Sequence, residues 1–270
     1  MKQKIGFLGV GKMGEALIEG LRKSGSDISV MGSTRTEESA KAAAKKLGIA
    51  CSTDSLGVVK ACQIIVLSVK PHQAQDLLEC MAGSFTKDHL IISICASLTL
   101  EQIKTWSGGK AKIIRAMPNT PALIGEGMSV LCAGSDVSDT EIKTAEALFH
   151  SVGKTAVVEE SLMDGVTGLS GCGPAYIYLI IEALSEAGVK VGLSRKLSTL
   201  LAAQTLKGAA EMVLSRAGEH PAAMKDEVTT PAGCTIDGLM ALEEGGLRVT
   251  LIKAVLAATR RSKKLRENDQ

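Results

Sequence analysis

The sequence has very few aromatic residues and almost no net charge. Of its 270 residues, 2% are Phe, Trp or Tyr, and the formal net charge at pH 7 is +2. Nucleic-acid bases stack on aromatic side chains, and phosphate backbones or anionic membranes bind basic surfaces. We therefore expect neither nucleic acid nor a membrane as a partner, and favour a small-molecule ligand.

The seven cysteines are scattered, odd in number and without a CxxC pair. This excludes a disulfide framework and gives no zinc spacing, so we predict no metal site and a reducing, cytoplasmic setting. No apolar run reaches the length of a membrane span. Because the first strand begins almost at Met1, we also expect no signal peptide.

A buried strand over residues 4–10 leads directly into a glycine-rich turn and then a helical pattern. In this context GxGxxG is the dinucleotide-binding pattern: the first glycine makes the turn, the second admits the pyrophosphate, and the third packs the helix on the strand. The phosphates then rest on the helix N-terminus. The predicted pyrophosphate site is Gly9, Val10, Gly11, Lys12, Met13 and Gly14.

The end of the second strand, residues 28–31, indicates which cofactor binds. An NAD site usually carries an acid there for the ribose hydroxyls. Here Ser33, Thr34 and Arg35 offer two hydroxyls and a guanidinium, which suit a ribose phosphate. We predict NADPH, with NADH possible because Glu37 could still reach a ribose.

Strands and helices continue to alternate as far as residue 158, which predicts an α/β fold with a Rossmann-type, doubly wound, mainly parallel sheet. Ligands of such sheets bind beyond the carboxyl ends of the strands. Residues at these ends are Val69, Lys70, Pro71, Cys95, Ala96 and Asn119, and Lys70 is a candidate for catalysis. The predicted strands cover residues 63–69, 90–95, 112–117, 127–132 and 154–158, and the helices residues 36–48, 139–150 and one from Thr99.

The pattern of the second half of the chain predicts helices and no strands. We place the boundary near residue 160, with a dinucleotide-binding domain over 1–160 and an all-α dimerisation and substrate domain over 161–270. Ser161 is expected to cap a helix, residues 171–174 to form a loop, and Gly188 to end the helix over 175–187. That helix is apolar nearly all round, so it must be buried. A segment of this size can hardly bury it alone, which predicts an intimate homodimer. Two long helices follow, over residues 195–216 and 247–266.

The segment Thr229–Gly246 is the candidate substrate site. Pro231 keeps Thr230 extended, Thr235 is expected to cap a helix over residues 236–244, and Gly245-Gly246 ends it. A helix start presents unpaired N–H groups and a positive dipole end, which suit a small carboxylate.

Five motifs together carry a family resemblance: the glycine turn, VKPH at 69–72, RAMPNTP at 115–121, DGVTGLSGCGPAY at 164–176, and HPAAMKDEVTTPAGCTIDGLMALEEGGLR at 220–248. Over its full length the chain resembles pyrroline-5-carboxylate reductase. The resemblance implies NAD(P)H-dependent reduction of 1-pyrroline-5-carboxylate to L-proline, the last step of proline biosynthesis. It also implies dimers with intertwined helical domains, often assembled five at a time into a decamer.

The resemblance further implies roles for single residues. Gly233, Cys234 and Thr235 would bind the substrate carboxylate through backbone N–H groups, and the Thr235 hydroxyl would bond the ring nitrogen. We expect this pocket to be shared between subunits. Two positions depart from the family pattern. Glu227, a substrate-site residue, stands where several relatives have Asn, and Cys172 replaces a Ser.

Two alternatives remain at this point. A β-hydroxyacid dehydrogenase-like enzyme would have the same two-domain plan but needs a general base, usually a Lys in the second domain. Lys190 and Lys207 are the only weak candidates, and Lys190 follows the expected helix end. A non-catalytic NADP-binding sensor would also share the fold.

Overall fold

The computed structural model describes residues 3–25 and 28–268, and the chain divides into two compact units. Residues up to Cys172 and from Ala257 form one, here called the sheet unit, and Gly173–Leu256 form the other, the helical unit. The sheet unit extends past residue 160 because the segment after β8 packs on the sheet, where Met163 is 3% exposed. This division follows contacts within one chain. The predicted domain boundary near residue 160 stays a prediction.

The sheet unit contains eight strands in the order β3-β2-β1-β4-β5-β6-β7-β8. All neighbours are parallel except β6 and β7, which pair antiparallel. The first six strands thus follow the doubly wound order, and the predicted fold class is confirmed. The strands are β1 (Gln3–Leu8), β2 (Ile28–Ser33), β3 (Ala50–Ser52), β4 (Ile64–Leu67), β5 (Leu90–Ser93), β6 (Lys112–Met117), β7 (Gly127–Ala133) and β8 (Gly153–Val157).

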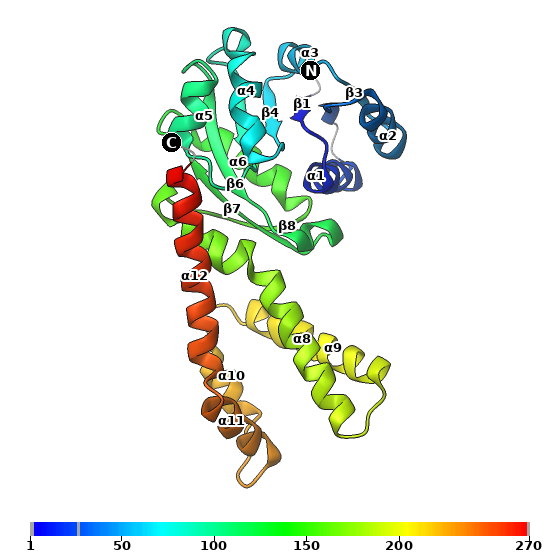
Figure 1. The fold of residues 1–270 in the computed structure, drawn as a ribbon, viewed down its shortest axis with the longest axis vertical. Coiled ribbons are helices and arrows are strands. Elements are labelled where there is room, and N and C mark those ends of the chain that lie inside the picture. The colour runs from blue at the N-terminus through cyan, green and yellow to red at the C-terminus, as the bar shows by residue number, and fades with distance from the viewer. Residues whose placement is uncertain (1–2, 26–27, 269–270) are drawn as a thin grey trace. The chain divides into compact units, whose positions relative to one another are not determined.

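Helices cover both faces of this sheet (Figure 1). Along β4, Ile64 and Val66 pack with α1, α2 and α6, whereas Ile65 and Leu67 pack with α3, α4 and α5. A strand apolar on both faces is the mark of a sheet covered on both sides. The helices are α1 (Lys12–Lys23), α2 (Glu37–Leu47), α3 (Ser55–Ala61), α4 (Ala74–Glu79), α5 (Leu100–Trp106), α6 (Asp139–His150) and α7 (Met163–Val166).

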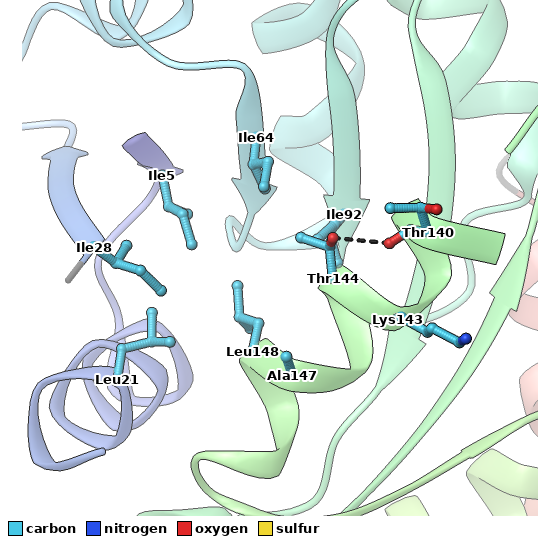
Figure 2. A pocket seen from close by; sticks show the side chains of 10 residues that line it. All are labelled: Ile5, Leu21, Ile28, Ile64, Ile92, Thr140, Lys143, Thr144, Ala147 and Leu148. Carbon is cyan, nitrogen blue, oxygen red and sulfur yellow. Dashed lines mark hydrogen bonds between the residues drawn. The ribbon is translucent and has the colours of Figure 1, made fainter. Parts of the chain in front are cut away.

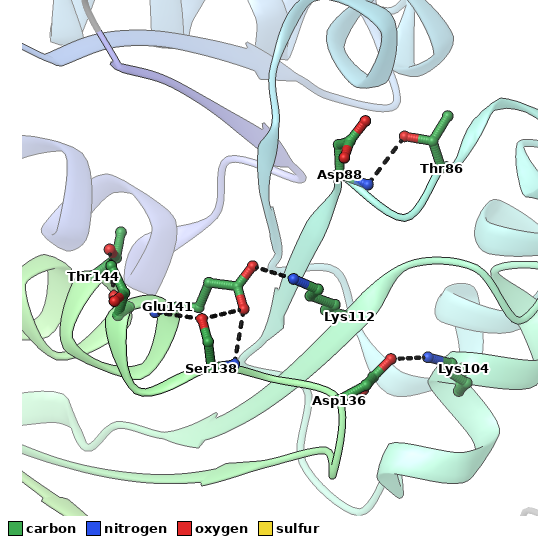
Figure 3. Close-up of polar contacts among 9 residues, drawn as sticks. Thr86, Asp88, Lys104, Lys112, Asp136, Ser138, Glu141 and Thr144 are labelled. Carbon is green, nitrogen blue, oxygen red and sulfur yellow. Dashed lines mark hydrogen bonds and ion pairs between the residues drawn. The ribbon is translucent and has the colours of Figure 1, made fainter.

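Ion pairs connect β6 and α5 to residues 136–141, which lead into α6 (Figure 3). Lys112, the first residue of β6, places its Nζ 2.8 Å from Glu141 Oε1. The other Glu141 oxygen accepts from the backbone and side chain of Ser138, which completes a capping box at the start of α6. Lys104 of α5 pairs with Asp136 in the same way. These contacts hold the amino end of β6, away from the carboxyl ends where a ligand is expected.

The first long helix of the helical unit begins earlier than predicted. Gly173 and Pro174 already belong to α8, which ends at Lys190 rather than at Gly188. Gly188 is instead a packing residue, because a Cβ there would lie 2.5 Å from Ser198 Oγ of the next helix. Helices α8 and α9 lie side by side through this contact. The helices are α8 (Gly173–Lys190), α9 (Arg195–Ser215), α10 (Pro221–Glu227) and α11 (Cys234–Glu244), followed by α12 (Leu247–Asn268), which returns to the sheet unit.

The helical unit has no hydrophobic cluster of its own within the described residues: all three clusters lie in the sheet unit. Large apolar side chains stay exposed on it instead, among them Leu179 at 65% and Leu200 at 63%. None of the helices in residues 3–25 and 28–268 combines the length and apolar run that a membrane span needs.

The segment after β8 does not start with the predicted cap. Ser161 lies inside a short 3₁₀ helix, η4 (Glu160–Leu162), and α7 follows without any side-chain cap. The tight 3₁₀ turn brings Met163 onto the sheet and buries Asp164. Ser262 of α12 donates a hydrogen bond of 2.7 Å to Asp164 Oδ1. Arg266 Nη1 lies 3.2 Å from Oδ2, a charge contact without hydrogen-bond direction. Asp164 thus fastens the end of α12 to the sheet unit.

Removing the Arg266 charge should destabilise the protein. Arg266→Ala leaves the buried Asp164 Oδ2 without its cation, which should lower the free energy of unfolding by about 1–3 kcal/mol. Arg261→Ala, at an exposed position of the same helix, is the matched control and should change stability by less than about 0.5 kcal/mol. Urea unfolding followed by circular dichroism measures both. Equal effects would show that Asp164 does not hold α12.

Candidate functional site

The glycine turn between β1 and α1 has the shape that a pyrophosphate needs. Gly9 adopts φ +88° and donates its N–H to Ser33 O at 2.9 Å. A Cβ on Gly9 would lie 2.8 Å from Val69, and one on Gly14 would lie 3.2 Å from Gly9 O. A Cβ on Gly11 would meet no atom within 4 Å. The outer two glycines therefore serve the turn and the helix packing, while Gly11 keeps the start of α1 open to a ligand.

A groove of about 520 Å³ lies at the carboxyl ends of β1, β2 and β4, next to this turn. Five predicted cofactor residues line it: Gly9, Ser33, Thr34, Arg35 and Val69. Arg35 is exposed and has no ion pair among the residues that the structure describes. Its guanidinium is therefore available to an anionic ligand. Ser33 is 1% exposed, and its hydroxyl is paired with that of Ser55 at 2.9 Å.

Two polar residues of the groove, Thr53 and Ser55, were missed from the sequence. They follow β3, a strand of three residues that carries too little periodicity to be recognised. Thr53 donates a hydrogen bond of 2.8 Å to Glu37 Oε1. Glu37 is the acid that left NADH open as a cofactor, and its carboxylate is already bonded in this structure.

The segment after β4 forms the next wall of the groove. Val69 lines it, and the 3₁₀ helix η1 (Pro71–Gln73) starts with Pro71 at its first position. His72 and Gln73 line the groove as well, although the sequence analysis did not assign them a role. Lys70 is the exposed N-cap residue of η1 and is not among the lining residues.

The loop after β5 is held at both of its ends. Cys95 Sγ donates to Val69 O at 3.2 Å, and burial raises the pKa of this thiol to about 11. Ser97, two residues on, has φ +66°, a conformation that costs a non-glycine residue about 1–3 kcal/mol. Glu160 Oε1 accepts the N–H of Leu100 at 2.7 Å. The same oxygen lies 2.6 Å from Arg115 Nη1.

Asn119 links parts of the sheet unit to one another. Its Oδ1 accepts the N–H of Met128 at 2.9 Å, and its Nδ2 donates to Ser170 O at 3.2 Å. The preceding strand and the turn Thr120–Ile124 therefore stay fixed to β7 and to the π-helical stretch Thr167–Gly171. In this structure the Asn119 amide is occupied by protein groups, and its role toward a cofactor remains a prediction.

The candidate substrate segment lies in the helical unit, and its helix starts two residues earlier than predicted. Gly233 is the N-cap residue of α11 and has no side-chain cap, so the expected Thr235 cap is wrong. Gly233 donates its N–H to Thr230 O at 3.0 Å, across a turn with Pro231 second and Ala232 at φ +57°. This turn directs the chain into the helix before Thr235 is reached.

As a result, Thr235 is the second helical residue, and the first-turn N–H groups of α11 have no acceptor within the helix. Most other helix starts are capped by their own side chains. Thr36, Asp54, Thr99, Ser138, Ser194 and His220 do this for α2, α3, α5, α6, α9 and α10. Among the helices that the structure describes, α1 and α11 begin at a glycine N-cap with no side-chain cap.

Glu227 ends α10 and is bound to Arg216, the C-cap residue of α9. Both of its carboxylate oxygens lie 2.9 Å from Arg216 Nη1. The ion pair raises the pKa of the arginine, mainly through the hydrogen bond from Arg216 to Glu227. Both side chains are partly exposed, so the pair adds little stability by itself. It joins α9 to the end of the helix that precedes the substrate segment.

A second cavity, of about 320 Å³, lies near the amino ends of the strands, opposite the carboxyl ends that border the groove (Figure 2). Ile5, Ile28 and Ile64, from the amino ends of their strands, line it together with Leu21 and Leu148. It has few polar groups and lies away from the glycine turn, so it is not the candidate site. Within the described residues no cluster of His, Cys, Asp or Glu could hold a metal ion.

The open glycine turn, the polar groove and the doubly wound sheet define a dinucleotide-binding α/β protein. Comparison with known proteins agrees. Residues 4–97 match the family described as "NADP oxidoreductase coenzyme F420-dependent", and residues 160–265 match "Pyrroline-5-carboxylate reductase dimerisation".

Individual relatives are similar over nearly the whole chain. Pyrroline-5-carboxylate reductase of Pisum sativum is 41% identical, over 97% of this chain and 95% of its own length. The solved structure of the Coxiella burnetii pyrroline-5-carboxylate reductase has a TM-score of 0.92 at 34% identity, covering 98% and 99% of the two chains. That of the Plasmodium falciparum enzyme, with NADP bound, has a TM-score of 0.86 at 36% identity and covers 98% of both. The chain belongs to the pyrroline-5-carboxylate reductase family.

Cysteine reactivity should follow burial. Burial raises the pKa of the Cys95 and Cys132 thiols from 9.0 to about 11, so both stay protonated at pH 8. Cys80 is exposed. In the native protein, iodoacetamide at pH 8 should label Cys80 and leave Cys95 and Cys132 unlabelled, which peptide mass spectrometry measures. Rapid native labelling of Cys95 would contradict the packing of the β5 loop.

The same two thiols make stability depend on pH at the alkaline end. Because the folded state keeps their protons where the unfolded state loses them, their contribution is complete below about pH 9 and is lost as pH rises toward 11.

Proposed function

We propose that this protein reduces 1-pyrroline-5-carboxylate to L-proline with NADPH. The observation that carries the proposal is family membership over almost the whole chain, including the segment Gly233–Thr235. Family membership also weighs against the two alternatives, a hydroxyacid dehydrogenase and a non-catalytic sensor.

The cofactor's pyrophosphate would rest on the start of α1, over Gly11, with Val10, Lys12 and Met13 completing the turn. Arg35 and Thr34 would hold the ribose phosphate, because a guanidinium binds phosphate through charge-assisted hydrogen bonds. A plasmodial relative with NADP bound supports this choice of cofactor. Val69, Pro71, Cys95, Ala96 and Asn119 would border the remaining groove, and the cation of Lys70 would lie close to the reacting end. When bound, NADPH supplies the hydride.

The substrate carboxylate would bind the N–H groups of Cys234 and Thr235. The N–H of Gly233 already donates to Thr230 O, so Gly233 would border the carboxylate without binding it. The first turn of α11 offers donors without an internal acceptor, together with the positive end of the helix dipole. This anchor would fix which face of the ring receives hydride. The Glu227 carboxylate would repel the anionic substrate, so we propose that Glu227 shapes the segment through Arg216 instead of binding the carboxylate.

The chemical demand on the protein is modest. A protonated cyclic imine is electrophilic, so hydride adds to its carbon and the C=N bond becomes a C–N bond with no further proton required. The main task is to hold the ring in the correct position. The Thr235 hydroxyl would hydrogen-bond the ring nitrogen as it changes from iminium to amine.

We also propose that the chain works as a homodimer formed through the helical unit. The unit leaves Leu179 and Leu200 exposed and builds no core within the described residues of one chain. Large apolar side chains exposed in such numbers favour an interface, and the family match over residues 160–265 is described as a dimerisation domain. A decamer of five dimers and a pocket shared between subunits remain predictions.

Loss of the Thr235 hydroxyl should slow the reaction. For Thr235→Ala, kcat/KM for the imine should fall about 10²–10³-fold, the usual effect of removing one hydrogen bond that strengthens in the transition state. Thr235→Ser should retain most activity. Thr250→Ala is the matched control, because the Thr250 hydroxyl donates to the backbone oxygen of Gly246, the residue just before its own helix. Initial rates of NADPH oxidation measure all three, and an unchanged Thr235→Ala enzyme would refute the role of Thr235.

A charge placed on the exposed face of α8 should break the dimer. Leu179→Arg would have to bury a cation in an apolar interface, so we expect a 28.1 kDa monomer with little activity. Leu123→Arg, at a position 51% exposed on the sheet unit, should leave the assembly intact. Sedimentation velocity measures both. A monomeric parent protein would contradict the proposed assembly.

A further inference from the structure

The Glu37 carboxylate lies near the residues proposed to bind the ribose phosphate of the cofactor, and it carries the same sign of charge as that phosphate. It lies in the first turn of α2, two residues after Arg35. An acid in this region of a doubly wound fold usually accepts the ribose hydroxyls of NAD. Beside a ribose phosphate the same carboxylate would repel the ligand, since like charges a few ångströms apart disfavour each other. An enzyme that uses NADPH therefore needs a means of restraining Glu37.

Thr53 supplies such a restraint in this structure. Its hydroxyl lies 2.8 Å from Glu37 Oε1 and donates a hydrogen bond to it. The position of Thr53 is itself fixed, because the preceding residue belongs to β3 and Ser52 O accepts the N–H of Thr34 at 3.0 Å. Thr53 also lines the groove next to Thr34 and Arg35. Thr53 thus lines the groove where the ribose phosphate is proposed to bind and also hydrogen-bonds the Glu37 carboxylate.

Among the residues that the structure describes, the serines beside the groove and Glu37 all leave Arg35 unpaired. Ser33 and Ser55 pair with each other at 2.9 Å, and Arg35 has no ion pair with Glu37 in the part of the chain that the structure describes. The negative charge of Glu37 is therefore held by Thr53, while the positive charge of Arg35 stays available to the ligand.

We propose that Thr53 is a specificity-determining residue: by holding the Glu37 carboxylate, it favours a 2′-phosphorylated adenosine over one with a free 2′-hydroxyl. The inference rests on the proposed use of NADPH. It makes Thr53 a positioning residue that acts through Glu37. Without this hydrogen bond, Glu37 is free to turn toward the ribose, where it would repel a phosphate or accept hydroxyls.

The test is a double-mutant cycle of Thr53→Val, Glu37→Gln and the two combined, in the full-length protein. Titration calorimetry with 2′,5′-ADP and with 5′-AMP measures binding without any reaction. Thr53→Val should weaken 2′,5′-ADP by about fivefold and leave 5′-AMP unchanged or tighter, a typical coupling for residues in contact. In the Glu37→Gln background the same substitution should have little effect. Thr53→Ser, which keeps the hydroxyl, should behave like the parent.

Three results would overturn the inference. If Thr53→Val weakened 2′,5′-ADP equally in the parent protein and in the Glu37→Gln background, Thr53 would act on the ligand directly. If Thr53→Val had no effect, the hydrogen bond would be irrelevant to binding. If the parent protein bound 5′-AMP as tightly as 2′,5′-ADP, the proposed cofactor preference itself would fail, whatever the outcome of the cycle. The ratio of kcat/KM with NADPH to that with NADH should fall in Thr53→Val alone.

Discussion

The backbone N–H groups at the start of a helix need acceptors, and in the described residues helices α1 and α11 start at a glycine that supplies no side-chain acceptor. Helices α1 and α11 begin at Gly11 and Gly233, neither of which offers a side-chain cap. Helix starts that serve only the fold, such as those at Thr36 and Ser138, are satisfied by their own hydroxyls. The same physical device would thus bind two anions, the pyrophosphate on α1 and the substrate carboxylate on α11. The proposed chemistry depends on these two unsatisfied helix ends.

The sequence predicted the features that depend on local pattern. The glycine turn from Gly9 to Gly14 and the apolar strand at Ile64–Leu67 follow from short-range rules, and the fold class followed from the alternation of strands and helices. The sequence could not predict features that depend on distant packing. Asp164 and Ser262 meet across 98 residues, and no short-range rule connects them.

The errors have physical causes of the same kind. Gly188 was predicted to end a helix, but it lies inside α8, where Ser198 of the next helix packs against it. Thr235 read as a cap, but the turn through Pro231 and Ala232 starts the helix at Cys234. The second correction keeps the expected anion site, because backbone N–H groups remain at the start of α11. The exposed leucines of the helical unit favour the proposed homodimer, in which a second copy would cover them.

We propose above all that the first turn of α11 binds the substrate carboxylate. A crystal structure of the enzyme with NADP⁺ and L-proline tests it most directly. We expect the proline carboxylate within hydrogen-bond distance of the N–H groups of Cys234 and Thr235, with the ring nitrogen near the Thr235 hydroxyl. A carboxylate bound by Lys or Arg side chains elsewhere, with the start of α11 facing only solvent, would contradict it.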